Sequence, residues 1–169
     1  MVFCMQRDRV ILGTNNKTGE FKNMEIIRLQ YKDKYWDKAI EFAENCSWIA
    51  GKHLAGMMRD NRFIDWEAVF FAVDNDKLYG YCTFLKEDYF PENKYCPWVS
   101  TLFVTEAARG KRLSHNLIGC AIDYAKEMGF SKVYIPSDKK GFYEKCGFQP
   151  IDKLKNYGGD METIFMKEI

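Results

Sequence analysis

A short basic turn is the stretch of this 169-residue sequence with the clearest chemical meaning. Residues 104–114 read VTEAARGKRLS, so a strand end passes through small and basic residues directly into a helix. The first N–H groups of a helix lack internal acceptors and lie at the positive end of its dipole, which suits this position to a phosphate group. Arg109, Lys111 and Arg112 add positive charge. A P-loop is excluded, because Thr105 and Arg112 stand where that motif needs Gly and Ser or Thr.

A second motif lies further along the chain. Residues 141–148 read GFYEKCGF and place Tyr143 on a short helix that follows a strand. Together the two motifs resemble those of the GNAT superfamily of N-acetyltransferases. In that family an R-x-x-G-x-G/A turn holds the pyrophosphate of acetyl-CoA, and an FYEKxGF segment supplies a tyrosine close to the thioester sulfur. The resemblance covers residues 24–167 and is strongest over residues 98–148.

The resemblance implies acetyl-CoA as co-substrate, with no metal, and implies which residues bind it. The pyrophosphate is expected on the turn formed by Arg109, Gly110, Lys111, Arg112, Leu113 and Ser114. Arg112 and Ser114 stand where the family has small residues, and we expect both to adopt helical φ, so that coenzyme A still binds. The Arg112 side chain either contacts a phosphate oxygen or is a plain surface arginine.

Acetyl transfer to an amine explains why such a tyrosine is needed. A primary amine has a pKa of about 10.4, so it must lose a proton before it attacks a thioester at neutral pH. A thiolate leaves on the other side, and a phenol with a pKa of about 10 is still protonated and can protonate it. The resemblance therefore implies Tyr143 as general acid. The alternative is an aromatic side chain packed in the core beside Phe142 and Phe148.

The strand at residues 98–104 is expected to hold the rest of the donor. By resemblance, Leu102, Phe103 and Val104 bind the pantetheine arm and acetyl group through their main chain, near a bulge whose N–H groups polarise the acetyl carbonyl. This strand carries no acidic residue. Glu87 or Asp88 in the preceding loop, or a chain of waters, is therefore the candidate base, and solvated loop carboxylates are the competing interpretation.

The same loop is rich in aromatic residues, which would suit a cationic amine, although core packing explains some of them equally well. These residues are Tyr89, Phe90, Tyr95 and Trp98. Neither His53 nor His115 has the partner spacing of a catalytic triad or a metal site, and we assign them no role.

The elements that position these residues follow from periodicity and turn signals. The pattern predicts strands at 24–29, 66–73, 78–85, 98–104, 132–135 and 161–167, and helices capped by Asp33 and Ser47, from Lys111 to Met128 and at 141–146. Gly129 and Gly147 predict Schellman ends. The order β-α-α-β-β-β-α-β-α-β predicts a mixed α/β (α+β), GNAT-like fold, with a central, mostly antiparallel mixed sheet flanked by helices. Residues 1–23 are predicted to be a loosely attached extension, with a short strand at 10–12, and residues 24–169 the acetyltransferase domain.

Composition excludes several classes of protein. Lys and Arg number 25 against 24 Asp and Glu, so the net charge of +1 provides no field for nucleic acid or an anionic membrane. With 47% hydrophobic residues the chain is not disordered, and no window holds the roughly 18 apolar residues of a membrane span. No signal peptide is evident. The six dispersed cysteines predict reduced, mostly buried thiols in a cytoplasmic protein.

We therefore expect an N-acetyltransferase in which a primary amine attacks acetyl-CoA directly in a ternary complex. Two alternatives stay open: a non-catalytic acyl-CoA-binding or interaction module on the same fold, and a longer acyl donor in place of acetyl. The acceptor is a small-molecule or peptide amine, because polyamines, antibiotics, amino acids and peptide termini all present one. Homodimers are common in the resembling family, so a homodimer is left open.

Overall fold

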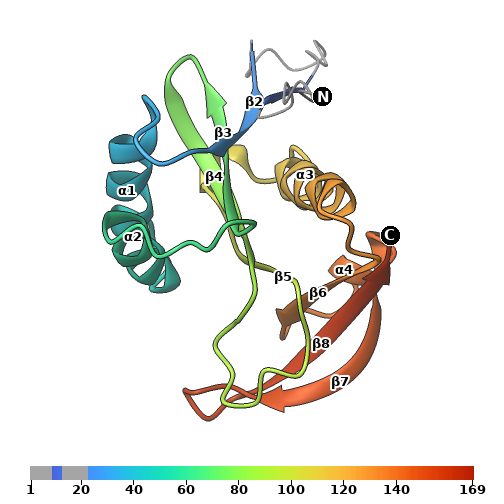
Figure 1. Ribbon diagram of the computed structural model, residues 1–169. Helices are drawn as coiled ribbons and strands as arrows, with labels where there is room; N and C mark the ends of the chain where they lie inside the picture. Colours follow the sequence, from blue (N-terminus) through green and yellow to red (C-terminus); the bar gives the residue numbers. More distant parts are fainter. Residues whose placement is uncertain (1–8, 13–22) are drawn as a thin grey trace, which may run out of the picture.

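The computed structural model describes residues 9–12 and 23–169 (Figure 1). The strands are β1 (Arg9–Ile11), β2 (Glu25–Leu29), β3 (Ala68–Asp74), β4 (Lys77–Leu85), β5 (Trp98–Val104), β6 (Lys132–Ser137), β7 (Gln149–Lys155) and β8 (Met161–Glu168). The helices are α1 (Trp36–Asn45), α2 (Ala50–Arg59), α3 (Leu113–Glu127) and α4 (Phe142–Lys145), with one 3-10 turn at Glu106–Ala108.

The strands form one eight-stranded sheet in the order β1-β2-β3-β4-β5-β6-β8-β7. The pair β5 and β6 is parallel, and the other neighbouring pairs are antiparallel. Helices α1 and α2 cover one face of β2–β5, and α3 covers the other (Figure 1). The predicted fold class, a mixed and mostly antiparallel sheet flanked by helices, is confirmed.

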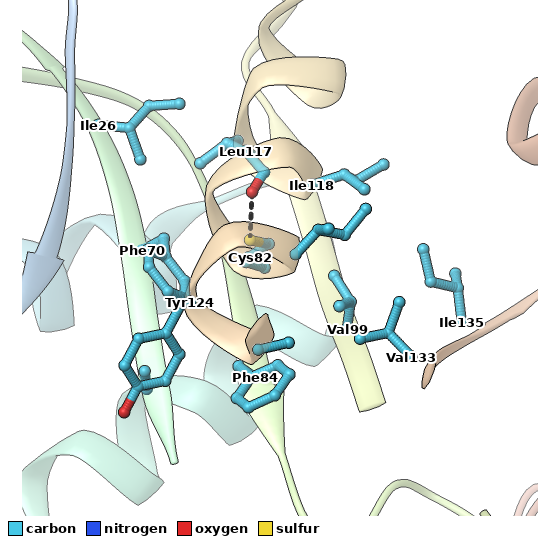
Figure 2. Close-up of a cluster of buried hydrophobic side chains, with 14 of the residues drawn as sticks. Ile26, Phe70, Cys82, Phe84, Val99, Leu117, Ile118, Tyr124, Val133 and Ile135 are labelled. Carbon is cyan, nitrogen blue, oxygen red and sulfur yellow. Dashed lines mark hydrogen bonds between the residues drawn. The ribbon is translucent and has the colours of Figure 1, made fainter. Parts of the chain in front are cut away.

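The apolar stripe predicted for α3 packs against the sheet (Figure 2). Leu117, Ile118 and Ala121 are at most 2% exposed and lie in one cluster with Phe84 and Val99 of the sheet. Burying a side chain of the size of Leu or Ile stabilises the fold by about 1.5–3 kcal/mol. This packing fixes the start of α3 relative to the end of β5, where the basic turn lies.

Both predicted Schellman ends are confirmed. Gly129 and Gly147 have φ of +83° and +84°. At each site the following phenylalanine N–H donates to a carbonyl five residues back, from Phe130 to Ala125 at 3.0 Å and from Phe148 to Tyr143 at 3.1 Å. The second of these bonds closes the short helix that carries Tyr143.

Three helix starts differ from prediction. Neither Asp33 nor Ser47 caps a helix: the positions before α1 and α2 are Tyr35 and Ile49, with no side-chain cap. The Asp33 carboxylate instead accepts the Gln30 N–H at 2.7 Å, because it sits in a turn that precedes the helix. Helix α3 begins at Leu113 rather than Lys111.

Strand β7 was not predicted. Its sequence QPIDKLK has no alternation of apolar and polar residues, and only Leu154 is buried. It lies at the edge of the sheet, where Pro150 is tolerated because no further strand needs its missing N–H. An edge strand buries little, so its sequence carries little signal.

The N-terminal stretch is described only in part. A short strand, β1, pairs with β2, and Arg9 forms an ion pair with Glu25 at 3.0 Å. Residues 1–8 and 13–22 of the predicted extension lie outside the described residues, and the domain boundary at Met24 stays a prediction. No helix in the described part of the chain is long and apolar enough to cross a membrane.

The described cysteines are all free thiols, but the prediction that they are mostly buried is wrong. Cys82 is buried, Cys96 is exposed, and Cys46, Cys120 and Cys146 are partly exposed. Cys46 and Cys146 directly follow α1 and α4, and Cys120 lies in the middle of α3, on a part of the helix that packing covers only partly. Cys4 lies outside the described residues.

Candidate active site

Strands β5 and β6 meet at one end only. Their single residue pair is Trp98 with Tyr134, beside which the Tyr134 N–H donates to the Pro97 carbonyl at 3.1 Å. Between this pair and the strand ends at Val104 of β5 and Ser137 of β6, the two described strands form no further residue pair. Figure 1 shows β6, β8 and β7 turning away from β3 and β4. The edge of β5 that faces β6 is therefore open along residues 99–104, where Leu102, Phe103 and Val104 were predicted to bind the donor.

A bulge interrupts β5 in this open stretch. Its pairing with β4 shifts between Tyr81 and Thr83, so that two residues, Thr101 and Leu102, lie opposite one. Thr101 has a φ of +48°, and its hydroxyl lies 3.2 Å from that of Thr83. Such a bulge re-aims main-chain groups at a strand edge, as the resemblance implied for this strand.

Close approach of β4 and β5 depends on Gly80. A Cβ there would lie 2.6 Å from the carbonyl oxygen of Phe103. Phe103 is buried on the side of α1 and α2, whereas Leu102 and Val104 are half-buried on the side of α3. All three candidate side chains therefore pack in the core, which leaves their main chain to face the opening.

The basic turn leads from β5 into α3 and leaves the helix start uncapped. Gly110 has a φ of +77°, and no side chain caps the first turn of α3, at Leu113 and Ser114. Arg109 lies 3.6 Å from Glu106 in an exposed pair, and Lys111 donates to the Ala107 carbonyl at 3.0 Å. The first N–H groups of a helix lack internal acceptors and lie at its positive end, so the start of this fifteen-residue helix has the properties expected of an anion site.

Arg112 does not have the helical φ that we expected. It has a φ of +59°, in the left-handed region, and directly precedes α3. The chain reverses at this residue to enter the helix, which is why a small residue is common at this position in the resembling family. A non-glycine residue here costs about 1 kcal/mol. The Arg112 side chain is exposed.

Tyr143 lies on α4 with its ring packed and its hydroxyl near Ser137. The ring centroid is 5.0 Å from that of Phe142 and 5.5 Å from that of Phe165, and the residue is 7% exposed. Burial raises the pKa of Tyr143 to about 12, opposed by a hydrogen bond with Ser137. The aromatic ring of Tyr143 therefore packs in the core, as the alternative interpretation expected. Its hydroxyl lies near Ser137, the last residue of β6.

A histidine links this tyrosine helix to the basic turn. His115, in the first turn of α3, has Nδ1 3.2 Å from the Cys146 Sγ, and its ring lies 5.4 Å from that of Phe142. Burial raises the pKa of the Cys146 thiol. The contact brings the two predicted motifs together in space. Sequence reasoning missed it, because the partners are 31 residues apart.

The two candidate bases have different surroundings. Glu87 is exposed, whereas Asp88 Oδ2 is buried and has no hydrogen-bond partner among the described residues. The other oxygen, Oδ1, accepts the Tyr89 N–H at 2.6 Å. Burial raises the pKa of Asp88, opposed by the Ser100 hydroxyl, the Tyr89 N–H and the charge of His53. Asp88 therefore has the properties of a base next to β5.

Further carboxylates lie near Asp88 and were not predicted. Glu162 on β8 is half-buried, and its pKa is raised by burial and by the charges of Asp88, Asp138 and Asp160. The sequence gives little signal for this group, because its members lie on three separate segments of the chain. In the described part of the chain no set of three or more His, Cys, Asp and Glu side chains is placed to hold a metal ion.

The aromatic residues of the loop at 87–96 have mixed roles. Phe90 is buried and stacks on the buried Trp98 at 5.6 Å, and Tyr95 stacks on Tyr134 at 4.9 Å. Tyr89 is 58% exposed. Phe90 and Tyr95 therefore attach the loop to Trp98 of β5 and Tyr134 of β6, and Tyr89 is available to a ligand.

Comparison with known proteins identifies the family. The model of the acetyltransferase (GNAT) family matches residues 28–148. This chain belongs to the GNAT family. It is accordingly an acetyl-CoA-dependent acyltransferase. No curated protein shows a significant match to the sequence.

Solved GNAT structures share the fold at low sequence identity. An aminoglycoside 6'-N-acetyltransferase complexed with coenzyme A has a TM-score of 0.65 and 16% identity, over 85% of this chain and 96% of that one. A GNAT acetyltransferase from Elizabethkingia anophelis with acetyl-CoA bound has a TM-score of 0.61 and 14% identity, over 86% and 98%. Spermidine N-acetyltransferase from Vibrio cholerae has a TM-score of 0.58 and 14% identity, over 86% and 93%.

A cavity of about 740 Å³ in this GNAT domain lies beside α1. Its lining includes Phe103 and Thr105 but neither Tyr143 nor Asp88. The Thr105 hydroxyl is buried without a hydrogen-bond partner among the described residues. The cavity therefore adjoins the end of β5 without containing the candidate acid or base.

Proposed function

We propose that this GNAT protein transfers the acetyl group of acetyl-CoA to a primary amine, which attacks directly in a ternary complex. The observation that carries the proposal is the uncapped start of α3 at the same end of the sheet as the open edge of β5. A diphosphate needs several convergent donors, and an extended amide-containing arm needs an unpaired strand edge. Residues 98–114 of this chain form one continuous segment that includes both the unpaired strand edge and the uncapped helix start.

The donor would be held mainly by main-chain groups. Acetyl-CoA supplies an activated acetyl group and a thiolate that leaves. The N–H groups at Leu113 and Ser114 would bind the pyrophosphate, with Arg109, Gly110, Lys111 and Arg112 forming the turn around it. The main chain of Leu102, Phe103 and Val104 would bind the pantetheine arm, and N–H groups at the bulge would polarise the acetyl carbonyl.

Tyr143 would act as the acid. With a pKa of about 12, its phenol is protonated at every pH at which the protein would be assayed. It can therefore donate a hydrogen bond to the sulfur as the carbon–sulfur bond breaks. A thiol has a pKa of about 8.5, so complete proton transfer from so weak an acid is uphill, and Tyr143 would act chiefly by stabilising charge on sulfur.

Asp88 would act as the base. Its buried Oδ2 has no hydrogen-bond partner among the described residues and would accept an N–H of the bound amine, while Ser100 and the Tyr89 N–H hold the carboxyl group. A raised pKa makes a carboxylate a better proton acceptor than an exposed one. Glu87, which is exposed, is the weaker candidate.

The nature of the acceptor is supported by the structural relatives. An aminoglycoside acetyltransferase and a spermidine acetyltransferase both share this fold, and both names specify an amine that is acetylated. At 14–16% identity these names do not carry over to this chain beyond the shared chemistry of an amine nucleophile.

Initial-rate kinetics with acetyl-CoA and a panel of amines test the proposal, with the acetylated product measured by mass. Direct attack predicts lines that intersect in double-reciprocal plots when both substrates are varied. Parallel lines would indicate an acetylated enzyme and contradict direct attack. Calorimetry with coenzyme A should show binding, and binding without acetylation of any amine would support the non-catalytic alternative instead.

A further inference from the structure

The acceptor side carries more negative charge than one amine can neutralise. Asp88, Asp138, Asp160 and Glu162 are close enough for the first three to raise the pKa of Glu162. None of the four forms an ion pair with a described residue. His53 is a basic side chain whose charge acts on Asp88, and one buried oxygen of Asp88 has no hydrogen-bond partner within residues 9–12 and 23–169.

Glu162 is held in a fixed position within this group. Its Oε1 accepts a hydrogen bond from the Asn156 side chain at 2.6 Å. Asn156 is itself held by the turn between β7 and β8, where its Oδ1 accepts the Asp160 N–H at 3.0 Å. The second oxygen of Glu162 makes no hydrogen bond or ion pair in the described part of the chain. A half-buried carboxylate near other carboxylates is costly unless a cation binds there.

Two exposed tyrosines lie beside this group. The Tyr157 N–H donates to the Tyr89 carbonyl at 3.2 Å, and the two rings are 5.3 Å apart. Tyr89 is 58% and Tyr157 63% exposed. Aromatic faces next to carboxylates attract organic cations, because the ring quadrupole and the charge act in the same direction. The backbone bond also joins the loop that carries Asp88 to the turn before Glu162.

We propose that Glu162 binds a second cationic group of the acceptor, so that this protein favours diamines and polyamines over monoamines. The inference rests on the proposed function. Asp88 receives the amine that is acetylated, and Glu162 holds an ammonium group further along the same molecule, next to Tyr89 and Tyr157. A monoamine fills the first position and leaves the second carboxylate without a cation.

Acetylation of 1,4-diaminobutane and of butylamine, which have the same carbon chain, tests the proposal. A charge-assisted contact predicts a kcat/KM about ten-fold higher for the diamine, chiefly through KM, beyond the factor of about two from its two equivalent amines. In Glu162→Gln the preference should shrink to that statistical factor, because kcat/KM should fall far more for the diamine than for butylamine. Gln can still accept the Asn156 hydrogen bond, so the fold is retained.

Glu168→Gln is the matched control, because it removes the same charge from the same strand. Glu168 is exposed and lies 3.7 Å from Lys132, at the opposite end of β8. This variant should keep the diamine preference. Equal kcat/KM for the two amines in the unaltered protein, or an equal loss for both in Glu162→Gln, would overturn the role of Glu162 and leave the proposed function standing. If the protein acetylated neither of these amines nor any other amine, both the proposed function and the role of Glu162 would be rejected.

Discussion

The donor side and the acceptor side of the candidate site are assembled in different ways. The proposed donor side consists of main-chain groups from one continuous stretch, residues 98–114, together with Tyr143. The proposed acceptor side consists of side chains from distant segments, Asp88 in the loop before β5 and Glu162 of β8. Main-chain groups remain when side chains change, whereas each carboxylate is a single group that one substitution removes. Acceptor chemistry should therefore be the more sensitive of the two to point substitutions.

The largest effect is expected at Asp88. Asp88→Asn removes the base and should lower kcat/KM for the amine by about 1000-fold, within the usual range for general base catalysis. In the unaltered protein kcat/KM should fall as pH drops through the raised pKa of Asp88, because protonation occupies the oxygen that accepts the amine proton. Glu87→Gln, at the exposed neighbour, should leave kcat/KM and its pH profile unchanged. An Asp88→Asn protein with full activity would remove the base assignment.

Asp88→Asn should at the same time stabilise the fold. The pKa of Asp88 is raised in the folded state, so the folded protein holds this proton more tightly than the unfolded chain. Its contribution to the free energy of unfolding is therefore lost as pH rises from about 3.9 through the raised value. At pH 7 the variant should gain about 1 kcal/mol in urea unfolding, because it no longer buries a carboxylate charge whose Oδ2 has no hydrogen-bond partner among the described residues. A loss of stability would show that the hydrogen bonds from Tyr89 and Ser100 to the carboxylate outweigh the cost of burying its charge.

Tyr143 on the donor side should show a smaller effect. Tyr143→Phe should lower kcat by about 100-fold and leave KM for acetyl-CoA nearly unchanged, because the ring packing is kept and only the hydroxyl is lost. With a pKa of about 12, Tyr143 should not cause any alkaline fall in rate below pH 10. Tyr124→Phe removes a hydroxyl that donates to the Trp66 carbonyl at 3.1 Å and should leave kcat unchanged. Full kcat in Tyr143→Phe would leave the tyrosine only its packing role.

The sequence could predict the elements that carry the proposed donor side and much less of what surrounds the proposed acceptor side. A strand, a basic turn and a helix in succession are local features, and the apolar period of α3 and the two Schellman glycines were confirmed. The left-handed φ of Arg112 was missed, because nothing in the type of that residue demands it. Asp88 could be proposed only as one of two loop carboxylates, since burial depends on how the loop packs on β5 and β8.

Tertiary contacts account for most of what could not be predicted. Glu162 lies in a strand of ordinary composition and acquires its surroundings from the turn at Asn156 and from Asp88. The contact of His115 with Cys146 joins segments 31 residues apart. Strand β7 buries only Leu154, so its composition carries no periodic signal. In each case the feature depends on which distant segments come into contact, and the local sequence pattern around each residue does not indicate those contacts.

The smallest effects are expected at Arg112. Two substitutions there separate the contribution of the main chain to acetyl-CoA binding from that of the side chain. Arg112→Gly should raise the free energy of unfolding by about 1 kcal/mol, because glycine adopts the φ of +59° without strain, and Arg112→Ala should not. Both variants should raise KM for acetyl-CoA about five-fold at low salt, and the effect should decline as ionic strength rises, if the exposed guanidinium contacts a phosphate. An unchanged KM in both would mean that the helix start holds the pyrophosphate through its main chain alone, and a change in the glycine variant only would show that turn geometry controls affinity.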